Sequence, residues 1–293
     1  MTQPAPAINV PAHMLFVGGM HRSGTTALAQ LLGSSPEISG LESSGARMGE
    51  GQFLQSEYPT GAAYGGPSRW ALDPRSHLTE ADVAPDGTTT AALWSAWGRY
   101  WDPKSKFLLE KTPINLTKTR YLQAAFPGAR FITITRHPLA HAFAVRKWSP
   151  TALERRGMLF HKAVLNWVLA HERFRSDEEY LERSLVIRYE SLISEPEKEL
   201  RRLSEFTGTS ITDASMIKGG KSDRYAEEWR RATSKRIEWR RSLSLSEQTR
   251  EFLDRSFLPR EARRIRKLYT DRVEALGYDL DNFSSADDWS RIR

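Results

Sequence analysis

The stretch that decides the fold is MLFVGGMHRSGTT, residues 14–26. Its leading apolar residues end at two glycines, a pattern that predicts a buried strand running into a tight loop. Apolar residues then recur at helical spacing over residues 25–33, which predicts a helix directly after the loop. A loop between a strand and a helix start directs free backbone N–H groups and the positive end of the helix dipole at an anion. The stretch therefore predicts an anion-binding loop.

The loop has the Gly-x4-Gly spacing of a P-loop, from Gly19 to Gly24. Thr25 stands where the P-loop of a nucleoside triphosphatase has its lysine, so the pattern lacks the usual clamp on the β- and γ-phosphates. Arg22, inside the loop, can supply positive charge instead. The simpler interpretation is a glycine-rich strand-to-helix turn with a capping Ser or Thr. The strand before the loop and the helix after it favour the anion site.

Three further apolar segments, at residues 107–109, 130–135 and 185–187, predict buried strands. Strands that alternate with helices predict a three-layer α/β fold, in which helices flank both faces of a central parallel sheet. Residues 43–86 are rich in Gly, Pro and aromatic residues, and so long an irregular stretch predicts a functional lid. The helical patterns cover residues 88–100, 116–126, 139–148, 153–181, 196–206 and 260–276.

The chain has 293 residues, no cysteine and a formal net charge of +7. Residues 218–267 hold 16 basic and 8 acidic residues, so the rest of the chain is close to neutral. This distribution excludes a uniformly basic nucleic-acid coat protein and predicts a basic, helical C-terminal part at residues 215–293. The lack of cysteine excludes disulfides, zinc–thiolate sites, iron–sulfur clusters and a cysteine nucleophile.

The expected organisation is a single domain over residues 13–293, preceded by a flexible N-terminus at residues 1–12 that is rich in Pro and Ala. No apolar run reaches the roughly 18 residues that a membrane span needs. Residues 1–11 also lack the basic and apolar regions of a signal peptide. These features predict a cytoplasmic protein.

Segments that follow one another along residues 14–208 resemble the sulfotransferases that use 3′-phosphoadenosine-5′-phosphosulfate (PAPS), in particular bacterial members related to the carbohydrate and tyrosyl-protein branches. The resemblance implies the P-loop NTPase-like sulfotransferase fold. It also implies transfer of a sulfuryl group from PAPS to a hydroxyl or amine, with 3′,5′-ADP as the product. The segments are RSGTT at 22–26, SPEI at 35–38, EKTPIN at 110–115, FPGARFITITRHP at 126–138 and RYESL at 188–192.

The resemblance implies a donor site with two anion-binding ends. The loop would hold the phosphosulfate, and Arg136 would grip the 3′-phosphate with a bidentate pair of hydrogen bonds. The family has a Ser eight residues after that arginine, where this chain has Ala144; His141 is either its replacement or a surface residue. The implied donor-binding residues are His21, Arg22, Ser23, Gly24, Thr25 and Thr26 in the loop, Arg136, Tyr189 at the adenine, and Lys221, Ser222 and Arg224 in a basic segment that closes over the donor.

Sulfuryl transfer needs in-line geometry and positive groups around the oxygens of the moving group. By the resemblance, Arg22 and Lys111 would supply that charge, and the sequence shows no metal-binding pattern. The histidine base of the cytosolic small-molecule branch is missing, because Pro113 occupies its position. A Glu after the second short strand is the base in other branches. The candidates here are Glu42, which is preferred, then Glu50, His21 and His77.

Two other function classes stay open from the sequence. A P-loop kinase would share the strand–loop–helix unit, and residues 107–110 could mimic its acidic strand, but the loop lacks the kinase lysine. A nucleic-acid binder could use the basic C-terminal part, which has few aromatic residues and no named motif. The preferred prediction is a bacterial sulfotransferase for a small-molecule, sugar or peptidyl acceptor. It would have no nucleic-acid partner and no membrane span, and it could form a homo-oligomer.

Overall fold

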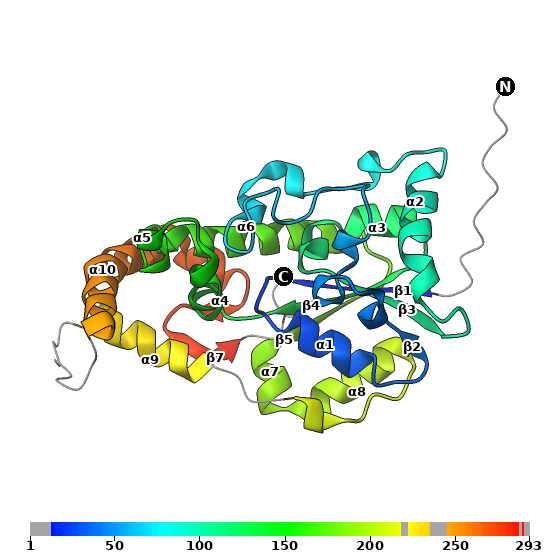
Figure 1. The fold of residues 1–293 in the computed structure, drawn as a ribbon. Coiled ribbons are helices and arrows are strands. Elements are labelled where there is room, and N and C mark those ends of the chain that lie inside the picture. The colour runs from blue at the N-terminus through cyan, green and yellow to red at the C-terminus, as the bar shows by residue number, and fades with distance from the viewer. Residues whose placement is uncertain (1–12, 218–221, 235–244, 287–288, 290–293) are drawn as a thin grey trace.

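A computed structural model describes residues 13–217, 222–234, 245–286 and 289 (Figure 1). The predicted flexible segment 1–12 and Lys221 lie outside the described residues. A five-stranded parallel sheet with the order β2-β3-β1-β4-β5 forms the centre of the fold. Its strands are β1 (His13–Gly19), β2 (Ile38–Ser39), β3 (Phe107–Lys111), β4 (Arg130–Thr135) and β5 (Ser184–Arg188).

The strands are apolar along most of their length because helices cover both faces of the sheet. Successive side chains of a strand point to opposite faces. In β1, Leu15 and Val17 pack with helices α1 and α8, whereas Met14 and Phe16 pack with α2 and α3. Figure 1 shows these helices on the two sides of the sheet. The predicted three-layer α/β fold is confirmed.

The helices of the described residues follow the predicted order, with one correction. The single helix predicted over residues 153–181 is wrong, because Gly157 and Leu159 adopt left-handed backbone angles, with φ of 104° and 57°, that divide it in two. The helices are α1 (Thr25–Leu32), α2 (Thr88–Trp97), α3 (Thr119–Ala125), α4 (Pro138–Val145), α5 (Ala152–Arg155), α6 (Phe160–Glu178), α7 (Tyr189–Ser194), α8 (Pro196–Thr207), α9 (Ser222–Thr233) and α10 (Leu245–Glu274).

The C-terminal part is not purely helical. After α10, an antiparallel hairpin of β6 (Tyr278–Asp279) and β7 (Asn282–Ala286) returns to the end of β4. There the His137 ring stacks on Phe283 with centroids 4.1 Å apart, and its Nε2 donates to the Asp279 carbonyl at 2.8 Å. The hairpin therefore fixes the backbone that follows β4, next to Arg136.

The long irregular segment at residues 43–86 is a packed layer of short 3₁₀ turns. Its Trp70 side chain is fully buried, and the Ala71 N–H donates to Asn166 Oδ1 of α6 at 2.7 Å. Its function as a lid stays a prediction. The short 3₁₀ helices of the described chain are η1 (Glu42–Ser44), η2 (Arg47–Gly49), η3 (Gly51–Phe53), η4 (Trp70–Leu72), η5 (Pro74–Ser76), η6 (Glu80–Asp82), η7 (Gly98–Tyr100), η8 (Pro113–Thr117), η9 (Arg146–Trp148) and η10 (Ala214–Met216).

A buried lysine joins this segment to the start of α3. Lys118 is fully buried, and its Nζ donates to the Ser76 carbonyl at 2.8 Å. The rings of Tyr58 and Tyr64 lie with their centroids 5.5 and 5.4 Å from the same nitrogen. Burial, assisted by the nearby Arg173 charge, lowers the pKa of Lys118 to about 7. The folded protein therefore releases this proton several pH units before the unfolded chain does.

Stability should rise with pH above about 7 through Lys118, because in that range the unfolded state holds one more proton than the folded state. Lys118→Met removes the titration and leaves the Ser76 carbonyl a hydrogen bond from Thr117 Oγ1 at 2.7 Å. Urea unfolding between pH 7 and pH 9 should show a smaller rise in the variant, by up to about 1.4 kcal/mol per pH unit. The exposed Lys104→Met is the control. Equal slopes in Lys118→Met and the wild type would contradict the prediction.

Candidate active site

The loop between β1 and α1 has the backbone of an anion-binding loop. Gly24 caps α1 in the left-handed region, with φ of 104°, and a Cβ there would lie 2.9 Å from the Tyr189 ring. A Cβ on Gly19 would lie 2.4 Å from the Ile134 carbonyl oxygen, so this position also requires glycine. Arg22 has a φ of 68°, an uncommon angle for a residue with a side chain. Such strain persists where the surroundings impose it, most often at functional sites.

A buried hydroxyl in this loop lacks a partner. Ser23 Oγ is buried and makes no hydrogen bond with any residue that the structure describes. Most buried polar groups are hydrogen-bonded, so an exception calls for a missing partner. Because the hydroxyl lies in the loop that leads into the N-terminus of α1, an anionic oxygen bound there would supply that partner.

Lys111 ends β3 beside the loop, because its strand position pairs with Val17 of β1. The side chain is 4% exposed. Its Nζ donates to the Met48 carbonyl at 2.7 Å and lies 3.4 Å from Thr26 Oγ1 and 3.4 Å from Glu50 Oε1. One ammonium group thus connects the loop, the end of β3 and the irregular segment.

The two glutamates considered as bases lie in different environments. Glu50 is 7% exposed, contacts Lys111 and accepts from Gln52 Nε2. Gln52 is itself held by its Oε1, which accepts from the Gly61 N–H at 2.9 Å. Glu42 is exposed on η1, and its carboxylate lies against Gly40. The contacts with Lys111 therefore favour Glu50.

Glu110, just before Lys111, is a buried clamp. Its carboxylate accepts from the Gly51 N–H at 2.8 Å, from Thr112 Oγ1 at 2.5 Å and from Asn115 Nδ2 at 2.5 Å. Burial raises the pKa of this carboxyl group. The carboxylate fixes the chain immediately after Glu50, a role that the sequence analysis missed. Its hydrogen bonds also engage both oxygens, which counts against the kinase-like acidic strand.

Arg136, at the end of β4, gathers several predicted donor-binding residues. It is 6% exposed; Nη1 donates to the Arg22 carbonyl at 2.9 Å and Nη2 to Ser222 Oγ at 2.9 Å. Its guanidinium stacks over Tyr189, 4.2 Å from the ring centroid, and lies 5.7 Å from the centroid of Tyr225. Arg136 Nε is buried and has no partner among the described residues. The structure therefore brings the Arg22 backbone, Arg136, Tyr189 and Ser222 together, and their binding of a donor stays a prediction.

A second buried carboxylate, that of Glu190, fixes the backbone next to Arg136. Glu190 Oε1 accepts from the His137 N–H at 2.9 Å, and Tyr278 Oη donates to Glu190 Oε2 at 3.3 Å. Burial raises the pKa of Glu190. The sequence analysis missed this arrangement, because Tyr278 comes from the hairpin that follows α10. The local sequence indicates this arrangement only through the glutamate directly after Tyr189 in the RYESL segment.

The three histidines that the sequence analysis considered lie in two places. His141 is fully buried, which excludes the surface alternative, and its Nδ1 bonds the His21 carbonyl at 2.9 Å. Burial lowers the pKa of His141 to about 3, and burial together with Lys111 and Arg47 lowers that of His21 to about 4. Both rings are therefore neutral near pH 7. His77 lies away from this cluster and bonds Asp177 at 2.8 Å.

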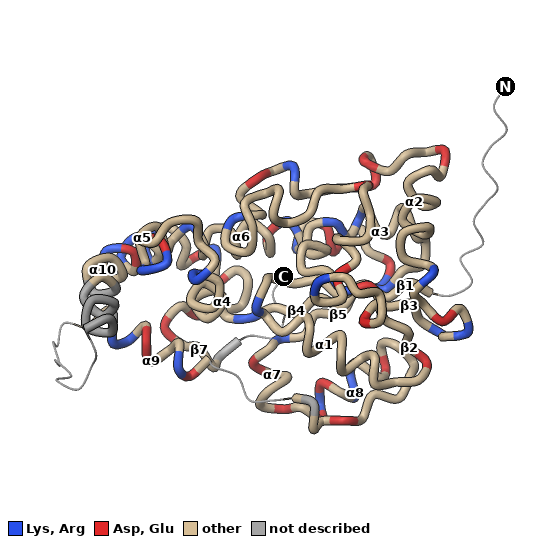
Figure 2. Tube along the Cα trace, in the orientation of Figure 1, with Lys and Arg blue, Asp and Glu red and all other residues tan. Residues whose placement is uncertain are grey.

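Several cations of the basic C-terminal part have acidic partners. Arg272 forms an ion pair with Glu172, Arg266 with Asp281, and Arg231 with Glu227. Figure 2 shows Asp and Glu interspersed with Lys and Arg along α9 and α10. Part of the excess positive charge therefore lies on helix surfaces beside acidic residues. Arg224 is exposed on α9 near Arg22, whereas Lys221 lies outside the described residues.

Two kinds of feature are absent from the residues that the structure describes. No three or more His, Asp or Glu side chains gather there as a metal ion would require. None of the helices in the same part of the chain has the length and hydrophobicity to cross a bilayer.

Comparison with known proteins supports one family. The model of the sulfotransferase family matches residues 15–213. Protein-tyrosine sulfotransferase 2 of Gallus gallus is 26% identical over 212 residues, which is 69% of this chain and 53% of that protein. Protein-tyrosine sulfotransferase 1 of Danio rerio is 27% identical over 211 residues, 69% of this chain and 55% of that protein. The chain thus spans about half the length of these curated relatives.

Solved structures with a similar fold include the sulfotransferase STF1 from Mycobacterium tuberculosis, with 17% identity, a TM-score of 0.44 and 70% of each chain covered. The sulfotransferase domain of the Synechococcus PCC 7002 olefin synthase has 16% identity and a TM-score of 0.45, over 86% of this chain and 97% of that one. With the family match over residues 15–213, the chain belongs to the sulfotransferase family.

Proposed function

We propose that this enzyme takes its sulfuryl group from PAPS and transfers it to a hydroxyl or amine of the acceptor, releasing 3′,5′-ADP. The observation that carries the proposal is the buried, unpartnered Ser23 hydroxyl in a loop flanked by Lys111 and Arg136. A donor with a phosphosulfate and a separate 3′-phosphate needs two anion-binding ends. The family supports sulfuryl transfer in general, and this arrangement supports the choice of donor.

At the first end, the loop amides, Ser23, Thr25 and Thr26 would hold the phosphosulfate, with Arg22 supplying charge. At the second end, Arg136 and Ser222 would bind the 3′-phosphate. The free Nε of Arg136 leaves a donor for this purpose. Tyr189, which packs against both Gly24 and Arg136, would contact the adenine. The neutral His21 belongs to the same loop.

Glu50 is the proposed catalytic base. Its buried carboxylate would take the proton of the acceptor hydroxyl, and its contact with Lys111 keeps it beside the loop. PAPS supplies an activated sulfuryl group, so that a bond from the acceptor oxygen to sulfur forms while the bond from sulfur to the phosphate-linked oxygen breaks. Lys111, Arg22 and the loop N–H groups stabilise the negative charge that develops on that leaving oxygen.

The acceptor is proposed by class only, as a small molecule, a sugar or a peptidyl group. The irregular segment at residues 43–86 contributes Glu50 and Gln52, so it would also shape the acceptor side of the site. Assembly into a homo-oligomer stays a prediction.

The donor proposal predicts that 3′,5′-ADP raises the melting temperature of the wild type in the presence of a metal chelator. Arg22→Ala and Arg136→Ala should each remove most of this rise, because each deletes a cation at one anion-binding end. Arg75→Ala is the matched control, since Arg75 is exposed and pairs with Asp73. Differential scanning fluorimetry of the four proteins measures the shift.

An unchanged shift in both Arg22→Ala and Arg136→Ala would refute the donor site. A rise with ATP and Mg²⁺, and none with 3′,5′-ADP, would instead identify a P-loop kinase. Either result can be read without knowing the acceptor.

The base assignment predicts that Glu50→Gln lowers turnover by roughly 10²–10⁴-fold, the usual contribution of a general base. The thermal shift with 3′,5′-ADP should persist, because the donor-binding groups are intact. Glu42→Gln is the paired variant and should keep most of the activity. Transfer of labelled sulfate from PAPS to acceptors in a host extract measures both. Loss of turnover in Glu42→Gln, with full activity in Glu50→Gln, would assign the base to Glu42.

A further inference from the structure

A cavity of about 380 Å³ lies between α9, α10 and the hairpin of β6 and β7. Its volume lies in the range of small-molecule sites. None of its lining residues belongs to the donor or acceptor groups proposed above. The charged and aromatic residues of the lining are Asp223, Trp229 and Arg230 of α9, Arg266 of α10, and Asp281 and Phe283 of the hairpin.

This cavity is separate from the donor side because it uses the other face of α9. Four of its lining residues, three or four positions apart along α9, share one face of that helix. Arg224 and Glu228 lie on the opposite face and line a second cavity, of about 470 Å³, together with Arg22 of the loop. The second cavity therefore belongs to the donor side.

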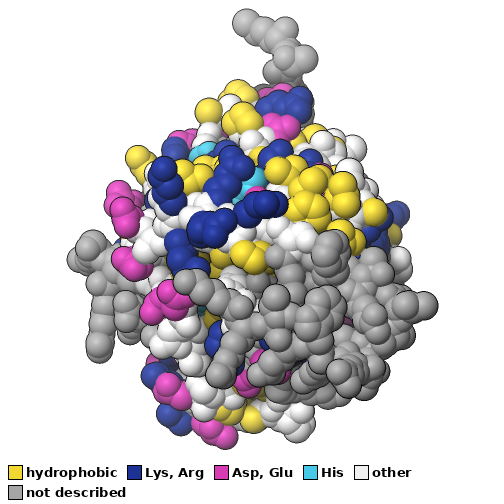
Figure 3. Space-filling view, turned by 90° about the vertical axis from the view of Figure 1, so that its left-hand side faces the viewer, with side chains coloured by type: hydrophobic (Ala, Val, Ile, Leu, Met, Phe, Trp, Pro, Cys, Tyr) yellow, Lys and Arg dark blue, Asp and Glu magenta, His cyan; other side chains and the backbone are white. Residues whose placement is uncertain are grey.

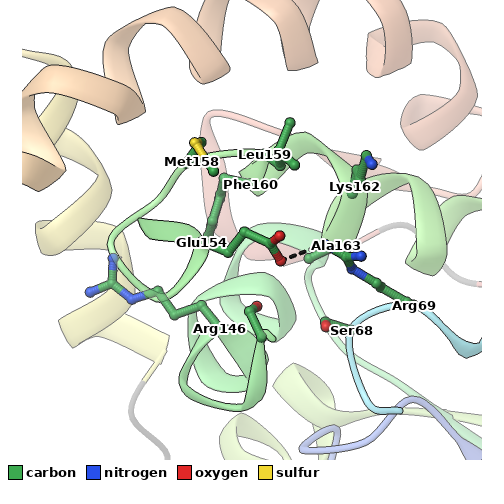
Figure 4. Close-up of a pocket in the computed structure, with 10 residues that line it drawn as sticks. Ser68, Arg69, Arg146, Glu154, Met158, Leu159, Phe160, Lys162 and Ala163 are labelled. Carbon is green, nitrogen blue, oxygen red and sulfur yellow. Dashed lines mark hydrogen bonds and ion pairs between the residues drawn. The ribbon is translucent and has the colours of Figure 1, made fainter. Parts of the chain in front are cut away.

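A third cavity, shown in the close-up at the start of α6, is too small for a ligand (Figure 4). Its volume is about 10 Å³, which is room for about one water molecule. Arg69 of the irregular segment and Glu154 of α5, both in its lining, form an ion pair with each other. Their charges are therefore already compensated.

Trp229 gives the cavity beside the hairpin a hydrogen-bond donor without a partner. Its side chain is 3% exposed, and its ring packs on Phe160 with centroids 6.2 Å apart. The Arg266 guanidinium carbon lies 5.7 Å from the centroid of the same ring. The indole N–H makes no hydrogen bond with any residue that the structure describes. Because most buried polar groups are hydrogen-bonded, an acceptor atom of a bound ligand would supply the missing partner.

The charges around this cavity leave one cation and one carboxylate uncompensated. Arg266 Nη2 donates to Asp281 Oδ1 at 2.7 Å, so these two charges neutralise each other. Arg230 and Asp223 form no ion pair with any residue in the described part of the chain. They are seven residues apart, which separates their Cα atoms by roughly 10 Å along the helix. Figure 3 shows that basic and acidic side chains both reach the surface on this side of the molecule.

Two walls of the cavity reach the surroundings of Arg136. Ser222, the first residue of α9, accepts from Arg136 Nη2 at 2.9 Å. Phe283 of the hairpin lines the cavity and stacks on His137, the residue after Arg136, with centroids 4.1 Å apart. A ligand that contacts α9 and the hairpin together would hold both against the end of β4, and so stabilise the chain around Arg136.

We propose that this cavity is a separate binding site for a small zwitterion, an ω-amino acid whose carboxylate and ammonium groups are joined by a chain of several carbon atoms. The carboxylate would accept from Trp229 Nε1 and pair with Arg230, and the ammonium group would pair with Asp223. A ligand with one charge alone would leave one end of the cavity uncompensated. The site does not depend on the proposed donor, whereas one consequence does: occupancy should strengthen the binding of 3′,5′-ADP through Arg136, and the coupling should be reciprocal.

The test uses 6-aminohexanoate as the probe, titrated by calorimetry into the full chain at low ionic strength. The wild type should bind it saturably, and should bind hexanoate and hexylamine at least roughly tenfold more weakly, because each lacks one charge. Trp229→Phe keeps the ring and removes the N–H, and should also weaken the binding. Arg230→Gln and Asp223→Asn should each weaken it roughly tenfold. Both are exposed residues, so these variants test the site even where Trp229→Phe does not fold.

The matched controls are Arg231→Gln and Glu227→Gln, which remove the same charges from exposed positions of α9 outside the cavity. No saturable binding by the wild type, equal binding of hexanoate or hexylamine, or equal weakening in the controls would each overturn the site.

The coupling is measured separately. Saturating 6-aminohexanoate should lower the Kd of 3′,5′-ADP for the wild type and leave it unchanged for Arg230→Gln. An unchanged Kd in the wild type would overturn the link to Arg136. A wild type that binds 6-aminohexanoate and not 3′,5′-ADP would refute the donor proposal instead, and the two failures are therefore distinguishable.

Discussion

The buried carboxylate of Glu110 is the interaction on which the geometry of the site depends. A carboxylate removed from water is costly unless its oxygens are hydrogen-bonded. Here the donors are the Gly51 N–H, Thr112 and Asn115, which come from the irregular segment, the end of β3 and η8. Leaving any of these groups unpaired would cost about 1–3 kcal/mol. The clamp therefore fixes Glu50, the residue before Gly51, against Lys111, the residue after Glu110.

A second buried, hydrogen-bonded carboxylate has the same role on the other side of the loop. Glu190 receives the His137 N–H and the Tyr278 hydroxyl, and so fixes the chain that follows Arg136. Both carboxylates lie just beyond or within the carboxyl ends of parallel strands, where ligands bind in open α/β sheets. The register of β1 with β3 and β4 then sets Lys111 and Arg136 on either side of the loop. The charged groups proposed to face the donor are thus positioned by buried carboxylates that bond to the protein itself.

The sequence was sufficient for the layers of the fold, whereas the donor-binding residues stay a prediction that the family resemblance implies. Strands buried on both faces leave continuous apolar runs, and the loop has glycines at fixed positions, so these patterns predict the sheet and the loop at residues 14–26. Lys111 and Arg136 were singled out by the family resemblance alone. The choice between Glu50 and Glu42 as the candidate base could not be made from these patterns. Spacing places both near the second strand, and only Glu110, about sixty residues later, selects which one turns inward. Likewise, the sequence could not decide whether His141 is a surface residue, because its burial depends on packing between distant elements.

The cations of the chain differ in whether an acidic neighbour compensates their charge. Where a cation of the C-terminal part lies on a helix surface, an acidic neighbour often accompanies it, as with Arg272 and Glu172. Among the described residues, the cavity lined by Arg22, α4, α5 and α9 has six cations and one carboxylate, that of Glu228, which pairs with Arg146; nearby Glu154 pairs with Arg69. Unbalanced charge at an ordered wall destabilises the fold through repulsion. Its presence next to the site, rather than on a distant surface, is what a binding function explains and folding alone does not.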